Sequence, residues 1–259
     1  MRGRPFLLVA LFAAAIVAVS GCTATASVHR AGEATSAAAD ASVGATYSAA
    51  DLSRLLDRAS VKLGVTGQLV GDAELKDAAR ELGGAEGLGR LLGDPGVTFS
   101  SASCGTLIRD ALSAGTPKDT IAAQLTAGSS SITVAANDGE PLSPAQKSSW
   151  IEPLDTMLSE CPHLTIDFDL AGKKTTADMT MKKVATSTTA DSTVGVVQTM
   201  TFALDGATVA AVNTVVQAVS GNLFVTVMNT RTNQATEWAG TDAPLDPVDA
   251  VNAVVESAD

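Results

Sequence analysis

Leu164-Thr165-Ile166-Asp167-Phe168-Asp169-Leu170 decides the fold class, because apolar and polar side chains alternate strictly along it. In a β-strand every second side chain lies on the same face, so this stretch predicts a strand with one face in the core and the other in solvent. Met179 and Met181 alternate with polar residues in the same way. The two stretches together predict an antiparallel hairpin.

The loop of this hairpin sets its register. A loop of even length keeps both apolar sets on one face, and residues 171–174 supply four residues. This register sets Asp167 opposite Asp178, with Asp169 one step along the same outer face. Opposed carboxylates repel, so this face is either a weak cation site or a solvated face neutralised by neighbouring lysines. The lysines are Lys173, Lys174 and Lys182. Calcium sites normally recruit more oxygen ligands than three scattered aspartates offer, which favours the solvated face.

More strands follow toward the C-terminus. Asp205-Gly206 is a hairpin-turn pair that joins residues 194–204 to residues 208–219. Ser220-Gly221-Asn222 then joins the latter strand to residues 223–230. Because residues 208–219 carry valines on both faces, we expect this strand to be central and covered on both sides.

Helical patterns precede the strands. Ser48 caps a helix with Asp51 three residues on, leucines recur at helical spacing, and Gly64 ends the run. A second helix is expected at residues 73–82. The glycine-rich residues 83–93 lack the spacing and the lysine of nucleotide-binding loops, so they are interpreted as a connection.

The middle of the chain mixes short elements. We expect extended segments at residues 97–100, 120–126 and 131–136, and a short helix at residues 104–113. Ser143-Pro144-Ala145-Gln146 is a helix start, and the helix should run to Glu160. Its apolar residues are expected to be buried: Trp150, Ile151, Leu154 and Leu158.

Two further features complete the helices. Pro153 lies inside the helix that starts at Ser143, where proline removes a hydrogen bond and kinks or splits the helix. A last helix starts at Asp246-Pro247, with Asp249 in its first turn. The predicted class is therefore α+β: an antiparallel sheet with N-terminal helices, a central helix and a C-terminal helix packed on it.

The N-terminus is typical of an export signal. Arg2 and Arg4 precede an apolar run that is too short for a membrane-spanning helix, and Val19-Ser20-Gly21-Cys22 is typical of a lipobox. Cleavage before Cys22 makes its thiol the lipid carrier, and two or three acyl chains hold a protein stably on a bilayer. The alternative is an uncleaved anchor helix.

These features divide the chain into three parts. Residues 1–21 are the expected lipoprotein signal peptide, residues 22–46 the lipidated cysteine and its linker, and residues 47–259 one extracytoplasmic domain. The small-residue stretch 23–46 has no apolar period and, as a flexible coil, spans about 27 Å r.m.s.. The predicted location is the extracytoplasmic face of a cell membrane.

Lipidation of Cys22 leaves Cys104 and Cys161 as an even pair in an oxidising compartment, which predicts a disulfide. In the chain-entropy model this crosslink stabilises the fold by about 4 kcal/mol. A reactive thiol or a metal ligand is the alternative, but no Cys-x-x-Cys motif is present.

Charge and aromatic content exclude nucleic acid as a partner. Removing residues 1–21, with Arg2 and Arg4 and no acid, leaves 15 of the 17 basic residues against 28 acids, a formal charge of −13. Nucleic acids and anionic membrane faces select basic patches instead. Few aromatics remain for base stacking. They are Tyr47, Phe99, Trp150, Phe168, Phe202, Phe224 and Trp238.

No catalytic constellation is present in the sequence. His163 is the one histidine beyond the linker, it follows Pro162, and no Gly-x-Ser-x-Gly accompanies it, so a surface or structural role is expected. The chain has too few histidines and cysteines for a zinc site, and no cofactor is predicted. Four methionines offer thioethers to copper, but their apolar strand positions favour core packing. They are Met179, Met181, Met200 and Met228.

The succession of elements resembles a known family. The helix at Ser48, a cysteine in a short helix, a Trp-bearing helix ending at Cys161 and late Val-rich strands are similar to the extracytoplasmic sensor domain of PknH-type actinobacterial kinases. That domain also occurs alone in small lipoproteins. Members often have two disulfides, whereas this chain retains one pair. The resemblance implies an α+β domain with a ligand-binding cleft and no known catalysis.

Three functional hypotheses remain open. The first is a membrane-anchored sensor-like or ligand-binding lipoprotein without catalysis, whose partners are the bilayer and an unknown small ligand, lipid or envelope protein. The second is a carrier of envelope lipids or glycolipids, in which the apolar strands line a cavity. The third is a cell-envelope hydrolase, which needs an activating base that His163 alone supplies.

Overall fold

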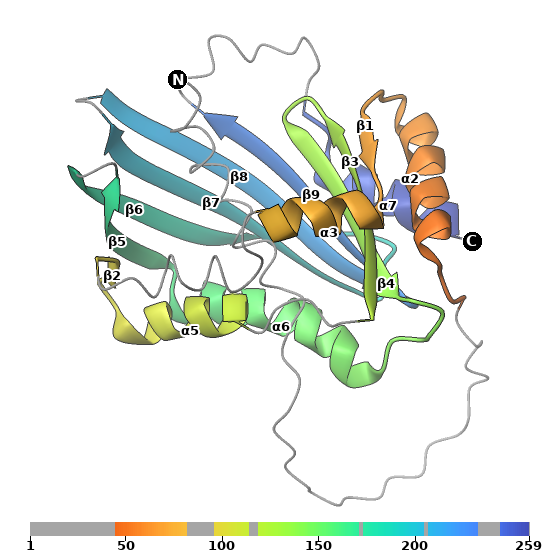
Figure 1. Ribbon diagram of the computed structural model, residues 1–259, viewed down its shortest axis with the longest axis horizontal. Helices are drawn as coiled ribbons and strands as arrows, with labels where there is room; N and C mark the ends of the chain where they lie inside the picture. The colour runs from red at the N-terminus through yellow and green to blue at the C-terminus, as the bar shows by residue number, and fades with distance from the viewer. Residues whose placement is uncertain are drawn as a thin grey trace, which may run out of the picture.

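The computed structural model describes residues 45–81, 96–113, 119–170, 173–204, 207–232 and 244–258. They form an α+β fold in which a nine-stranded sheet is flanked by helices (Figure 1). The helices are α2 (Ala49–Leu63), α3 (Asp72–Glu81), α5 (Ala102–Ser113), α6 (Pro144–Glu160) and α7 (Pro247–Ala258). The strands are β1 (Gln68–Val70), β2 (Thr98–Phe99), β3 (Thr120–Ala127), β4 (Ser130–Asn137), β5 (His163–Leu170), β6 (Lys173–Val184), β7 (Ser192–Leu204), β8 (Ala207–Ser220) and β9 (Leu223–Thr232).

All neighbouring strands are antiparallel, in the order β1-β3-β4-β9-β8-β7-β6-β5-β2. β8 is therefore the central strand, as its valines on both faces predict. Gly221, at φ 56°, lies in the turn that joins β8 to β9. The predicted fold class is confirmed.

Helices pack on both faces of the sheet, at different places along it. α2 and α7 cover the face to which Val216 of β8 points, over β3, β4, β9 and β8. α5 and α6 lie on the opposite face, to which Val215 points, and α6 packs over β6, β7 and β8. Adjacent residues of β8 thus contribute to two separate cores because strand side chains alternate.

Local capping signals start these helices where the sequence predicts. The Ser48 side chain accepts from the backbone N–H of Asp51, and the Asp51 carboxylate accepts from the Ser48 N–H at 2.9 Å. Gly64 ends α2 in the left-handed region, at φ 65°. Asp246 Oδ1 accepts from the N–H groups of Val248 and Asp249, at 2.8 Å and 3.2 Å, and so caps α7.

α6 differs from expectation at Pro153. The helix runs unbroken from Pro144 to Glu160 through the proline, so it is not split. Trp150 and Leu154 are buried as predicted, whereas Ile151 and Leu158 are only partly buried. The helix persists because its N-terminus is capped and its inner face is packed against the sheet.

The β5–β6 register also differs from the prediction. Leu170 pairs with Lys173, so the connection has two residues instead of four, and those two lie outside the described part. An even loop of either length keeps the apolar residues on one face, but the shorter loop moves each pair by two residues. Asp167 therefore lies opposite Thr176, and the predicted apposition of Asp167 with Asp178 is wrong.

Several predictions concern residues outside the described ranges. They are the signal peptide and lipidated Cys22, nearly all of the linker, the glycine-rich connection at 83–93 and the Asp205-Gly206 turn. Within the described ranges, the helices are too short or too polar to cross a bilayer.

Candidate ligand pocket

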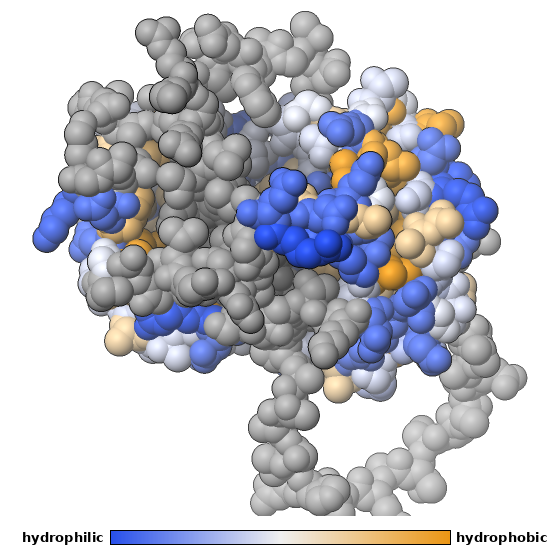
Figure 2. Space-filling model, viewed as in Figure 1, coloured by the Kyte–Doolittle hydropathy of each residue, from blue (hydrophilic) through white to orange (hydrophobic). Residues whose placement is uncertain are grey.

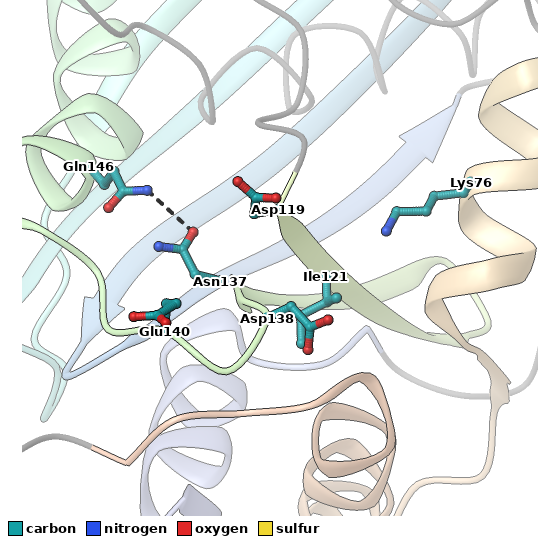
Figure 3. Close-up of a pocket in the computed structure, with 7 residues that line it drawn as sticks. All are labelled: Lys76, Asp119, Ile121, Asn137, Asp138, Glu140 and Gln146. Carbon is teal, nitrogen blue, oxygen red and sulfur yellow. Dashed lines mark hydrogen bonds between the residues drawn. The ribbon is translucent and has the colours of Figure 1, made fainter.

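An open pocket with a volume of 470 Å³ lies where α3, the β3–β4 hairpin and the start of α6 meet (Figure 3). This volume is within the range of small-molecule sites. Apart from one isoleucine, the described residues of the lining are polar. The lining residues are Lys76, Asp119, Ile121, Asn137, Asp138, Glu140 and Gln146.

The β3–β4 hairpin brings two parts of this lining together. Thr120 pairs with Asn137, so the residue that precedes β3 and the residues that follow β4 lie side by side. The Asp138 N–H donates to the Asp119 carbonyl at 2.9 Å, which extends the ladder by one bond beyond the strands. The carboxylates of Asp119 and Asp138 are therefore held on adjacent backbone.

A network of amides fixes the side of the pocket nearest α6. Gln146 Nε2 donates to Asn137 Oδ1 at 3.3 Å (Figure 3). Gln146 Oε1 accepts from the Ser143 N–H at 2.9 Å. Asn137 Nδ2 donates to the Pro141 carbonyl at 3.4 Å. Gln146, the third helical residue in the capping box of α6, thus also orients Asn137, which is only 7% exposed.

α3 supplies the basic side chain of the lining. Lys76 Nζ lies 2.8 Å from Asp72 Oδ2, and Asp72 Oδ1 accepts from the Ala122 N–H of β3 at 3.0 Å. Asp72 therefore joins α3 to the edge of the sheet and neutralises Lys76 at the same time. No residue of α3 is buried, and its outward surface is hydrophilic (Figure 2).

The three acidic side chains of the pocket, unlike Lys76, have no ion-pair partner among the described residues. Asp119, Asp138 and Glu140 are exposed, and none forms an ion pair with another described residue. The described residues contain no group of three or more His, Cys, Asp or Glu side chains able to hold a metal ion. The described part of the lining is therefore negative, and it contains no chelating group.

The disulfide is the predicted feature that the structure confirms. Cys104 of α5 and Cys161, the C-cap of α6, are bonded, with 5.7 Å between their Cα atoms. Both are buried, at 2% and 1% exposure, so this crosslink staples two helices on one face of the sheet. Cys22, the predicted lipid carrier, lies outside the described residues.

The histidine and the aspartates that the sequence suggests as functional residues lie outside the pocket lining. His163 is exposed at the start of β5, with Nε2 3.9 Å from Asp178 Oδ1. Asp178 and Asp167 accept from Thr165 and Thr176, at 3.0 Å and 2.6 Å, so each acid already has a donor. The cation site considered for this face is absent from the described residues.

The methionines lie in the core, as predicted. Met179, Met181 and Met200 are at most 3% exposed, and Met228 packs against the same core as the first two. Met179 Sδ is 2.7 Å from the amide nitrogen of Gln198, which donates to it. A packed, hydrogen-bonded thioether is a core residue and not an available copper ligand.

Sequence patterns single out none of the pocket residues except Gln146, and that one only as the third helical residue of the helix start at Ser143. The remaining signal is polar residues immediately outside the two strands of a hairpin, at 119 and 138–140. That pattern is common at turns, so it indicates a site only after α3 and α6 are placed beside it.

No protein-family model and no curated protein matches this chain. A solved structure similar to it is that of an uncharacterized protein from Mycobacterium smegmatis. The two are 18% identical, and the match covers 63% of this chain and 75% of that one, with a TM-score of 0.30. A TM-score this low assigns neither a family nor a function.

Proposed function

We propose that this chain is a non-catalytic ligand-binding domain held at the extracytoplasmic face of a membrane by acylated Cys22. The observation that carries the binding role is the 470 Å³ pocket with convergent polar side chains between α3, the β3–β4 hairpin and α6. This volume is in the range of small-ligand sites, in which oriented polar groups fix the position of the ligand.

The arrangement of the pocket supports binding better than catalysis. The lining residues within the described ranges are amides, carboxylates, one isoleucine and one paired lysine, and they include no histidine, cysteine or hydroxyl nucleophile. His163, the base that a hydrolase needs, lies on β5 and is not in the lining. The resemblance to PknH-type sensor domains, which implies a cleft without known catalysis, agrees with this role.

The packing of the described core favours a polar ligand over a lipid. Leu52, Leu55, Leu56 and Val134 are fully buried in the cluster between the sheet and α2 and α7. The described pocket offers a single apolar lining residue, Ile121. An acyl chain needs a far larger apolar wall, because its binding free energy comes from burying methylene groups, each of which contributes about 0.8 kcal/mol.

Filling the pocket tests this proposal. Glu140→Trp places a bulky ring in it, whereas Glu152→Trp adds the same ring on the exposed face of α6, away from the lining. The small-molecule fraction of an actinobacterial envelope extract is the probe, and saturation-transfer NMR on the full chain is the readout. Saturation transfer to a compound with the wild type and Glu152→Trp, but not with Glu140→Trp, is the expected result.

Two outcomes would contradict the proposal. One is transfer that Glu140→Trp leaves unchanged, which places binding elsewhere. The other is no transfer to any compound from the wild type. Chemical unfolding of both variants confirms that the comparison is made between folded proteins.

A further inference from the structure

We propose that residues 45–47, where the predicted lipid tether enters the domain, act as a strap that holds one wall of the pocket in place. Through this wall, docking of the strap and binding of a ligand favour each other. The inference rests on the proposed function and concerns the regulation of that same pocket. It follows from the hydrogen bonds that join the strap, a buried asparagine and the pocket wall.

The strap is attached to the domain by backbone contacts at both of its ends. Tyr47 forms a parallel bridge with Asp138, and its carbonyl accepts from the Gly139 N–H at 3.0 Å. The Ala45 carbonyl accepts from Asn222 Nδ2, also at 3.0 Å. The Tyr47 side chain is partly buried and packs against the core beneath α2 and α7. The strap is therefore part of the fold at the point where the tether begins.

Asn222 joins the strap to the pocket wall. This residue lies in the turn between β8 and β9 and is only 6% exposed. Its Nδ2 donates to the strap, while its Oδ1 accepts from the Leu142 N–H at 3.0 Å. One buried amide therefore binds a backbone group of each segment. Loss of either contact leaves part of this amide without a partner, which is unfavourable in a buried position.

The pocket wall is residues 138–142, which connect β4 to α6. Asp138 and Glu140 of this wall line the pocket. Two backbone N–H groups of the wall, those of Gly139 and Leu142, donate to the strap and to the buried asparagine. The wall that carries these two carboxylates is therefore held partly by contacts that lie outside the pocket.

The strap can be released without unfolding the domain. Ser48, the next residue, caps α2 with its own side chain, so the start of this helix does not need the strap. Ala45 and Thr46 are exposed. Segments held by a few exposed hydrogen bonds open at a lower free energy than the core does. The docked and the released strap are therefore two states of the same folded chain.

Release of the strap loosens the pocket wall, because Gly139 and Asn222 lose their partners. A ligand that contacts the ordered wall then binds the docked state more tightly, and it shifts the population toward the docked strap. This coupling is reciprocal, so release of the strap lowers the affinity for the ligand by the same factor. Binding in the pocket and the position of the tether are thus linked.

Hydrogen exchange of the full chain in detergent, read at single amides by NMR, tests the strap. Asn222→Asp keeps an acceptor for Leu142 but removes the donor to Ala45, and Asn222→Ala removes both without adding charge. In both variants the Gly139 amide should exchange about five-fold faster than in wild type, the equilibrium value of one hydrogen bond. Neither change alters the acceptor of Gly139, which is the Tyr47 carbonyl.

Two controls separate release of the strap from other effects. Asn252→Asp makes the same substitution in α7, where Oδ1 accepts from the Thr189 N–H at 2.8 Å, a contact that a carboxylate keeps. Exchange at Gly139 should stay at the wild-type rate in this variant. The amide of Val225, a fully buried residue of β9, reports the global stability of each chain. An increase at Gly139 that does not exceed the increase at Val225 in the Asn222 variants overturns the strap.

Addition of the small-molecule envelope fraction tests the coupling to the pocket. The fraction should slow exchange at Gly139 in the wild type but not in Glu140→Trp, whose ring fills the pocket. Saturation transfer with the wild type, together with unchanged exchange at Gly139, overturns the regulation and leaves the ligand-binding function standing. No saturation transfer to any compound from the wild type removes both proposals.

Discussion

At the scale of single residues, threonine hydroxyl groups donate hydrogen bonds to Asp167 and Asp178 on the exposed face of β5 and β6. Thr165 donates to Asp178 and Thr176 donates to Asp167, each across the strand pair. Every acid thus lies opposite a donor and not opposite a second acid. A cross-strand hydrogen bond is favourable where opposed carboxylates are not, so this face is stable without a bound cation.

Protonation of Asp51 reduces the stability of the fold. Hydrogen bonds from the Ser48 side chain, the Ser48 backbone and Arg54 hold the pKa of Asp51 well below its ordinary value of 3.8. The folded state therefore keeps this carboxylate ionised at pH values where the unfolded chain binds a proton. The stabilisation is complete above pH 3.8 and is lost as the pH falls below it.

Asp51→Asn should therefore lower the free energy of unfolding at neutral pH. The difference in unfolding free energy between wild type and variant should become smaller as the pH falls below 3.8. Urea unfolding at several pH values measures this. Asp57→Asn, on the same helix, is the matched control and should remain close to wild type. A gap that is constant from neutral to acid pH would contradict the linkage.

At the scale of elements, α6 shows how packing overrides a local helix breaker. Its capping box at Ser143 and Gln146, its buried Trp150 and the disulfide at Cys161 hold both ends and the inner face. Trp150 also contacts Phe224 of β9, with 4.7 Å between ring centroids. These contacts maintain the helix through Pro153, where sequence alone predicts a kink or a break.

Pro153→Ala should consequently raise the free energy of unfolding by about 1–3 kcal/mol, because alanine restores a backbone donor and suits a helix interior. Chemical denaturation of the oxidised protein measures the change. Glu152→Ala, at the exposed neighbouring position, should change stability by less than about 0.5 kcal/mol. Lower stability of Pro153→Ala would mean that the ring contributes more by packing than it costs in the helix.

α3 is the opposite case among the elements. Its helical pattern is correctly predicted, but none of its residues is buried. A helix this short has little stability alone in water. The Asp72 contacts with Lys76 and with the Ala122 N–H therefore matter for the position of α3, and with it one side of the pocket.

At the scale of the whole molecule, the tether is the prediction with the largest consequence. Cys22→Ser removes the thiol that lipidation requires, so the chain should leave the washed membrane fraction or retain its signal segment. Fractionation and intact-mass measurement in an actinobacterial host test this. Thr23→Ser, at the next position, is the control and should stay with the membrane. A Cys22→Ser chain that has lost residues 1–21 and still stays with the washed membrane would rule out the lipid anchor.

Much of the fold could be predicted because its signals are local. The caps at Ser48 and Ser143, the strand alternation at 164–170 and the turn at Gly221 each act within a few residues. The Cys104–Cys161 bond followed from counting cysteines, since one pair remains once Cys22 is assigned to lipid. The β5–β6 register did not follow, because loops of two and four residues satisfy the same alternation.

The sequence by itself determined the α+β class, the helix starts, the central place of β8 and the disulfide, because periodicity, capping and residue type fix them locally. Only the tertiary structure decided the pocket. Its side chains come from α3, from the open end of the β3–β4 hairpin, where β3 begins and β4 ends, and from α6, and they meet only when these elements dock. Their convergence depends on packing between distant segments, and no local pattern records that packing.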